Sequence, residues 1–70
     1  MKNEVGARVK ELRLEKGMTQ QQMADILKID RGNYSRYESG KFQFNNEMLI
    51  IICKYFNITA GQLLGLEDLS

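Results

Sequence analysis

The chain has 70 residues, which suits one domain with a small hydrophobic core. Its formal net charge is +1, it lacks histidine, and its single cysteine excludes an internal disulfide. The sequence contains no nucleophile motif, phosphate-binding glycine loop or cluster of metal ligands, so we predict neither an enzyme nor a cofactor. We recognise no signal peptide and no apolar run long enough to span a membrane, which predicts a cytoplasmic protein.

The first predicted helix covers residues 3–16, with Asn3 as its N-cap and Gly17 as its terminator. Its apolar residues recur at helical spacing and predict a stripe that faces the core: Val5, Val9 and Leu12. Its basic residues are placed on the remaining surface: Arg8, Lys10, Arg13 and Lys16.

Two further short helices are predicted within residues 19–40. The first covers residues 20–27 and starts with a capping box, because Thr19 is followed three residues later by Gln22. Ala24 is small and lies where two helices that cross at a steep angle would touch. A small residue at that point favours close packing of this helix against the next one.

The second of these helices covers residues 31–39 and is capped by Asp30. Gly40 ends it, because glycine takes a left-handed conformation at no steric cost. The tight turn between the two helices contains Lys28, Ile29 and Asp30. This arrangement predicts a helix-turn-helix.

At about 100° per residue, the helix over residues 31–39 has two different surfaces. Tyr34 and Tyr37 point toward the core. An opposite arc of about 140° carries Arg31, Gly32, Ser35, Arg36 and Ser39. Arginine can bond two acceptors of guanine, serine can donate or accept, and glycine permits a close approach. We predict that four residues of this arc read base edges in the DNA major groove: Arg31, Gly32, Ser35 and Arg36.

The polar residues around this arc have more than one explanation. Asn33, at its edge, either bonds the DNA backbone or caps locally, and we assign it, with Ser39, to DNA phosphates. Asp30 also faces the groove, but we favour its role as N-cap because phosphates would repel a carboxylate. Residues 1–41 carry nine Lys and Arg against six Asp and Glu, an excess that suits phosphate contact and equally a solvated surface.

A loop with two phenylalanines leads to a fourth predicted helix over residues 46–56. Its core face comprises Leu49, Ile52, Cys53 and Phe56. A second capping box, Thr59 with Gln62, starts a short fifth helix over residues 60–64 that ends at Gly65. With five helices and no strand, the predicted class is all-α, a compact single domain over the whole chain.

The fourth helix carries a second apolar stripe beside its core face: Met48, Ile51 and Tyr55. Lys54 is nearly the only polar residue in this part of the helix, whereas a surface helix normally keeps its far side charged. Such a helix is either buried on most sides or presented to a partner. We favour a homodimer that forms through this helix and its flanking loop over additional burial within the chain.

Two long stretches resemble the phage-repressor (Cro/Xre-type) helix-turn-helix family. They are ELRLEKGMTQQQMADILKIDRGNYSRYESGK and NEMLIIICKYFNITAGQLLG, and the resemblance covers about residues 5–66. Its most specific elements are T-Q-x-x-[apolar]-A, then E-x-G after the turn, and the ending F-x-[apolar]-[ST]-x-x-x-LLG. The resemblance implies a lambda-repressor-like fold of five helices and a transcriptional regulator that binds double-stranded DNA.

The resemblance also implies roles for two residues near the reading helix. Gln20, at the start of the second helix, and Lys41, after the third, match residues that hold DNA phosphates in the family. An ordinary first-turn glutamine and a solvated lysine are the alternatives. The chain departs from the family's pattern at Lys28, where glycine is usual in the turn, and at Tyr34, which replaces a branched aliphatic residue.

From these features we predict a sequence-specific DNA-binding transcriptional regulator, a repressor that binds an inverted-repeat operator as a homodimer. The alternative is a protein-interaction module, such as an antitoxin that neutralises a toxin through its exposed apolar helix. DNA binding would then be secondary or lost. The fold is compatible with both functions.

Overall fold

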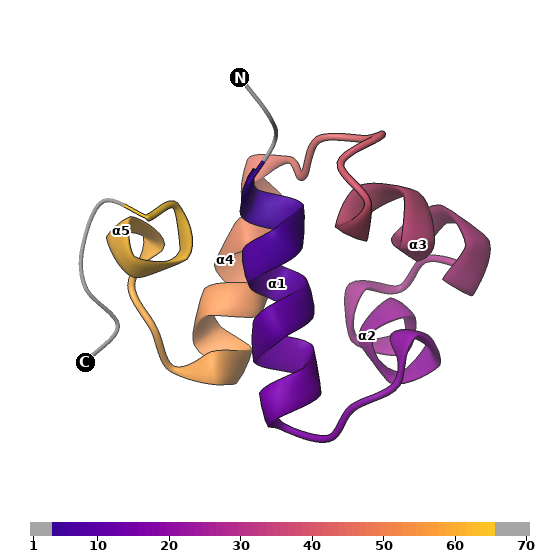
Figure 1. Cartoon of the computed structure of the whole chain (residues 1–70), viewed down its shortest axis with the longest axis horizontal. Helices are drawn as coiled ribbons and strands as arrows, with labels where there is room; N and C mark the ends of the chain where they lie inside the picture. The colour runs from indigo at the N-terminus through magenta and orange to yellow at the C-terminus, as the bar shows by residue number, and fades with distance from the viewer. Residues whose placement is uncertain (1–3, 66–70) are drawn as a thin grey trace.

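The structure, a computed structural model, describes residues 4–65 and has α1 (Glu4–Glu15) at its centre (Figure 1). α2 (Gln20–Leu27) and α3 (Arg31–Glu38) lie together on one side of α1, and both were predicted with nearly these bounds. The proposed N-cap of the first helix, Asn3, lies outside the described residues.

The rest of the fold consists of α4 (Asn46–Phe56), beside α1, and α5 (Ala60–Leu63), on the side away from α2 and α3 (Figure 1). Five helices and no strand within the described part of the chain confirm the all-α prediction. None of the helices described between residues 4 and 65 has the length and apolar character needed to cross a membrane.

The starts of α2 and α5 are fixed by local hydrogen bonds. Thr19 Oγ1 accepts a bond from the Gln22 N–H at 3.1 Å, and Gln22 Oε1 accepts one from the Thr19 N–H at 2.8 Å. Thr59 and Gln62 form the same reciprocal pair at α5. Both predicted capping boxes are confirmed, and they explain why the sequence locates these helix starts so well.

The turn between α2 and α3 has the left-handed conformation that usually requires glycine, although Lys28 occupies it with φ 61° and ψ 42°. The N–H of Ile29 donates to the Ala24 carbonyl at 3.0 Å, and that of Lys28 donates to the Asp25 carbonyl at 3.2 Å. These 6→1 and 5→2 bonds form a Schellman motif, with Lys28 at its left-handed position. Lysine therefore preserves the turn, with a backbone strain of roughly 1–2 kcal/mol.

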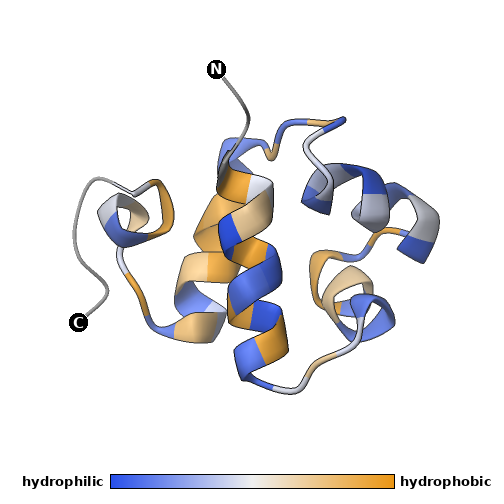
Figure 2. Ribbon diagram, viewed as in Figure 1, coloured by the Kyte–Doolittle hydropathy of each residue, from blue (hydrophilic) through white to orange (hydrophobic). Residues whose placement is uncertain are grey.

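The hydrophobic core contains apolar side chains from every helix. The buried ones are Val9, Leu12, Met23, Ala24, Leu27, Tyr34, Met48, Ile52, Phe56 and Leu63. Figure 2 shows that α1 and α4 carry strongly hydrophobic residues, whereas α3 is coloured mostly hydrophilic. α3 therefore contributes little apolar surface to the core, and other contacts must hold it.

The inward face of α4 differs from the predicted one. Ile52 and Phe56 are buried as expected, but Met48 joins them, whereas Leu49 and Cys53 are only half-buried. Leu49 and Cys53 still pack against the core, whereas the prediction was wrong about Met48, because α4 is apolar on most sides. Hydrophobic periodicity then defines no single inner face.

Gly6 allows α1 to lie very close to the C-terminal end of α3. A Cβ atom at this position would lie 2.4 Å from the Glu38 carbonyl oxygen and 2.7 Å from that of Tyr37. These atoms belong to the backbone and cannot turn aside as a flexible side chain could. The absence of a side chain at Gly6 therefore sets the distance between the two helices.

We expect Gly6→Ala to lower the free energy of unfolding by roughly 1–3 kcal/mol, because its methyl group would push α1 away from α3. The matched control is Gly32→Ala in α3, where an added Cβ would meet only Asp30 Oδ1, at 3.8 Å. Alanine's higher helix propensity should leave that variant as stable as wild type or more so. Urea denaturation followed by circular dichroism compares them, and equal midpoints would contradict the close packing at Gly6.

Candidate nucleic-acid interface

The outward surface of α3 carries the polar side chains that the sequence placed there. The exposed residues are Arg31, Gly32, Asn33, Arg36 and Ser39, and Ser35 is half-buried. On the inner side, Tyr34 is fully buried and Tyr37 packs against the core. The predicted division of α3 into a core side and a polar outer side is confirmed, and the DNA contacts themselves stay predictions.

The start of α3 is held by Asp30, whose Oδ1 accepts a hydrogen bond from the Asn33 N–H at 2.7 Å. This confirms Asp30 as the N-cap. The side chain of Asn33 has a separate contact, because its Oδ1 accepts a bond from Arg36 Nη1 at 3.1 Å. Asn33 therefore contacts a predicted base-reading residue through its side-chain oxygen. Its side-chain nitrogen is the group that would donate to a DNA phosphate, and this contact stays a prediction.

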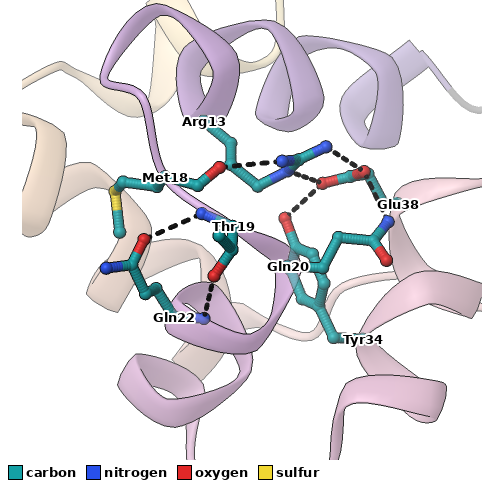
Figure 3. Close-up of polar contacts among 7 residues, drawn as sticks. All are labelled: Arg13, Met18, Thr19, Gln20, Gln22, Tyr34 and Glu38. Carbon is teal, nitrogen blue, oxygen red and sulfur yellow. Dashed lines mark hydrogen bonds and ion pairs between the residues drawn. The ribbon is translucent and has the colours of Figure 1, made fainter.

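Arg13 is buried, and its predicted place on the surface of α1 is wrong. Its guanidinium forms an ion pair with Glu38 of α3, with Nε 2.8 Å from Oε2 and Nη2 3.1 Å from Oε1 (Figure 3). The third nitrogen, Nη1, donates to the Met18 carbonyl at 2.8 Å. The guanidinium thus ties α1 both to the end of α3 and to the loop before α2.

The Glu38 carboxylate accepts hydrogen bonds from side chains of α1, α2 and α3. Besides the two from Arg13, it accepts one from the Tyr34 hydroxyl at 2.6 Å and one from Gln20 Nε2 at 3.0 Å (Figure 3). Burial by itself would raise the pKa of Glu38, but the bonds from Arg13, Tyr34 and Gln20 hold this pKa below its usual value. The carboxylate is therefore ionised at neutral pH, and it fixes the orientation of the helix that carries it.

Gln20 lies at the start of α2, as predicted, and its side chain donates a partly buried hydrogen bond to Glu38 of α3. A cleft of about 240 Å³ opens beside it, lined by Lys10, Gln20, Ser35, Glu38 and Ser39. Lys10 of α1 is exposed at this cleft, and the sequence pattern had indicated no specific role for it. A lysine beside a helix N-terminus offers positive charge to an anion, and the assignment of Gln20 to DNA phosphate stays a prediction.

The predicted outer stripe of α4 is exposed only in part. Met48 is only 6% exposed, so its assignment to an outer stripe is wrong, and Ile51 is half-buried. Tyr55 is exposed as expected. A groove of about 400 Å³ runs between α4 and α5, and its apolar lining includes Leu49, Ile50, Cys53 and Leu64.

Chemically reactive groups are sparse in the described part of the chain. Between residues 4 and 65, no group of three or more His, Cys, Asp and Glu residues lies so that it could hold a metal ion. Burial raises the pKa of the Cys53 thiol, so this side chain is protonated at neutral pH and weakly nucleophilic. The arrangement of α2 and α3 is suited to binding through polar and basic side chains.

A family model and several characterised relatives match this chain. A family model described as "Helix-turn-helix domain" matches residues 6–69. The HTH-type transcriptional activator BcrR of Enterococcus faecalis is 39% identical over 66 residues, which are 94% of this chain and 32% of that protein. The antitoxin PezA of Streptococcus pneumoniae is 38% identical over 64 residues, which are 91% of this chain and 40% of that protein.

One further relative and one solved structure extend this likeness. The HTH-type transcriptional regulator AnsR of Bacillus subtilis is 38% identical over 60 residues, which are 86% of this chain and 52% of that protein. The chain thus spans about a third to a half of these relatives' lengths. The crystal structure of the clp gene regulator ClgR from C. glutamicum superposes with a TM-score of 0.75 at 24% identity, covering 94% of this chain and 91% of that one, which shows a shared fold.

The buried ion pair can be tested by removing one partner. Arg13→Met should lower the free energy of unfolding by roughly 3–5 kcal/mol, because it leaves the Glu38 carboxylate buried without its counter-charge. The double variant Arg13→Met with Glu38→Gln should recover part of this stability. The amide oxygen of the new glutamine carries no charge and can still accept the hydrogen bond from the Tyr34 hydroxyl. Thermal and urea unfolding of both variants give the comparison.

Arg36→Met serves as the matched control for Arg13→Met, because Arg36 is exposed. The same substitution there should change stability by no more than about 0.5 kcal/mol. Equal destabilisation by the two substitutions, or a double variant less stable than Arg13→Met alone, would contradict the role given to the ion pair.

Proposed function

The chain belongs to the helix-turn-helix domain family, of the phage-repressor-like (Cro/Xre) type, and we propose that it is a sequence-specific DNA-binding transcriptional regulator, acting as a repressor. The observation that supports this best is the outer face of α3, where polar side chains are presented on a helix anchored by the Arg13–Glu38 ion pair. It acts by binding, without catalysis or a cofactor, in the cytoplasm where it meets DNA.

We propose that the outer face of α3 lies in the major groove of double-stranded DNA. The base-reading residues are Arg31, Gly32, Ser35 and Arg36, as the sequence predicted. The phosphate-binding residues are Gln20, Asn33, Ser39 and Lys41. Arg31, Arg36 and Lys41 are all exposed and give this side of the molecule its basic character. The exposed Lys10 beside Gln20 supplies further positive charge toward the DNA backbone.

The proposed regulator works as a homodimer, which matches the two-fold symmetry of an inverted-repeat operator. We place the dimer contact at the groove between α4 and α5, because an exposed apolar surface of this kind is typically buried against a partner. Ile50 is 53% exposed and Leu64 43% exposed. Of the predicted stripe, Met48 belongs to the monomer's core and Ile51 is half-buried, whereas Tyr55 is exposed but is not among the residues that line this groove.

Base reading and phosphate binding are separated by comparing Arg36→Ala with Lys41→Ala. Arg36→Ala should weaken binding to the selected operator by about 1–3 kcal/mol and relax the preference at one position per half-site. Lys41→Ala should weaken binding to all duplexes about equally and reduce the salt dependence by about one unit for each phosphate that the variant no longer binds. The operator is first selected from random DNA fragments, and affinities are then titrated at several salt concentrations.

Two results of the same titrations would contradict the proposal. If Arg36→Ala lowers the affinity for operator and scrambled duplex alike and keeps the ranking of operator variants, then Arg36 binds the backbone. If the wild-type protein binds both duplexes equally, sequence-specific regulation is excluded.

The dimer contact is tested by placing a charge in the groove. Ile50→Lys should weaken self-association by at least about tenfold, because burying an unpaired ammonium is unfavourable. The control is Leu14→Lys, an equally exposed apolar residue on α1 (57% exposed), which should leave association unchanged. Sedimentation with and without operator measures both, and a monomeric wild type that binds operator singly would exclude the dimer.

A second candidate function is favoured by one relative and by the same groove. PezA is named an antitoxin, and the apolar groove between α4 and α5 could receive a protein partner instead of a second copy. In that function DNA binding is secondary. A wild-type protein that stays monomeric and shows no sequence preference would favour this candidate over the regulator.

A further inference from the structure

The guanidinium of Arg36 has two side-chain neighbours that come from different parts of the chain. Its Nη1 donates to Asn33 Oδ1 at 3.1 Å, one turn earlier in α3. Its Cζ lies 6.0 Å from the centre of the Phe42 ring, in the loop after α3. This distance lies at the limit for attraction between a cation and an aromatic face. The guanidinium of this exposed arginine thus has one hydrogen-bond partner and one aromatic neighbour.

Phe42 is itself anchored, although 39% of it is exposed. Its ring meets the Tyr37 ring edge to face, with the centres 5.3 Å apart and an angle of 77°. Tyr37 in turn lies 5.2 Å from the Phe44 ring, and both pack against the core. A row of three aromatic rings thus connects the core with the Arg36 guanidinium.

The backbone adds a second link between Phe42 and Arg36. The Arg36 carbonyl accepts hydrogen bonds from the N–H of Lys41 at 2.9 Å and from that of Phe42 at 3.1 Å. The same oxygen accepts a bond from the Ser39 hydroxyl at 3.1 Å. These bonds close the turn at the end of α3 and hold Phe42 at a fixed place beside the arginine.

We propose that Phe42 and Asn33 are positioning residues that hold Arg36 in the orientation in which it reads a base. This inference rests on the proposed DNA-binding function and deepens it. A free arginine side chain loses much rotational freedom when it binds, and holding it in advance reduces that loss. Since guanidinium has five N–H donors and Asn33 occupies one, enough remain for a bidentate contact to guanine.

A purely structural role for Phe42 leads to different consequences. If the ring only filled space beside Tyr37, its removal would affect binding equally whether Arg36 is present or absent. If it acts through Arg36, the effect of its removal on operator affinity requires the guanidinium. A double-mutant cycle distinguishes these cases, because it isolates the interaction between the two side chains.

The test combines Phe42→Leu and Arg36→Ala, singly and together. Leucine keeps an apolar side chain against Tyr37 but removes the aromatic face. Phe42→Leu should weaken operator binding by roughly threefold to tenfold in the wild-type background and by less than about twofold in the Arg36→Ala background. Phe42→Tyr, which keeps the ring, should bind the operator like wild type. Thermal melts of all variants establish that each one is folded.

A measurement without DNA separates this inference from the proposed function. In NMR spectra of the free wild-type protein, the aromatic ring should displace the resonances of the Arg36 side chain, and Phe42→Leu should abolish that displacement while Phe42→Tyr retains it. Unchanged Arg36 resonances in Phe42→Leu, or equal reductions in affinity in both backgrounds, would overturn the positioning role alone. A wild-type protein without operator preference would overturn the proposed function and base reading together, whatever the spectra show.

Discussion

The Arg13–Glu38 ion pair holds α3 in place, and the geometry of the candidate interface depends on it. The two side chains are 25 positions apart in the chain and join the C-terminal half of α1 to the last residue of α3. Taking both charges out of water is unfavourable, and only good hydrogen-bond geometry offsets that penalty. Here the carboxylate also accepts bonds from Tyr34 and Gln20, so its charge is well compensated.

The helix that presents the polar face is short and has few apolar residues of its own. Within α3, Tyr34 is the large apolar side chain that is fully buried, and its hydroxyl bonds the same carboxylate. Gly6 brings the backbone of α1 against the carbonyls of Tyr37 and Glu38. Close backbone contact and buried polar bonds therefore replace the wide hydrophobic contact that a surface helix normally has. This leaves the rest of α3 available for recognition.

The parts of the fold that were predicted correctly depend on nearby residues. Capping boxes, glycine stops and the Asp30 cap act within a few positions, and the helix bounds and the outer arc of α3 follow from them. Arg13 was misplaced because its partner is distant in sequence, and a basic residue on a helix normally faces solvent. Met48 was wrongly predicted to face outward because α4 is apolar nearly all round (Figure 2). Gly6, in the first turn of α1, was the available sequence signal for close packing, whereas no sequence pattern indicated the contact between Arg36 and Phe42.

The burial of Tyr34 gives this tryptophan-free chain an optical reporter at the base of α3. Burial, and then the bond to the Glu38 carboxylate, raise the pKa of the Tyr34 hydroxyl far above the value of about 10 that a phenol has in water. Because this pKa is higher in the folded state, alkaline solution favours unfolding once the pH exceeds the unfolded-state value. As the pH rises, the ultraviolet absorbance of the Tyr34 phenolate should therefore appear together with the loss of the packing between α3 and the core.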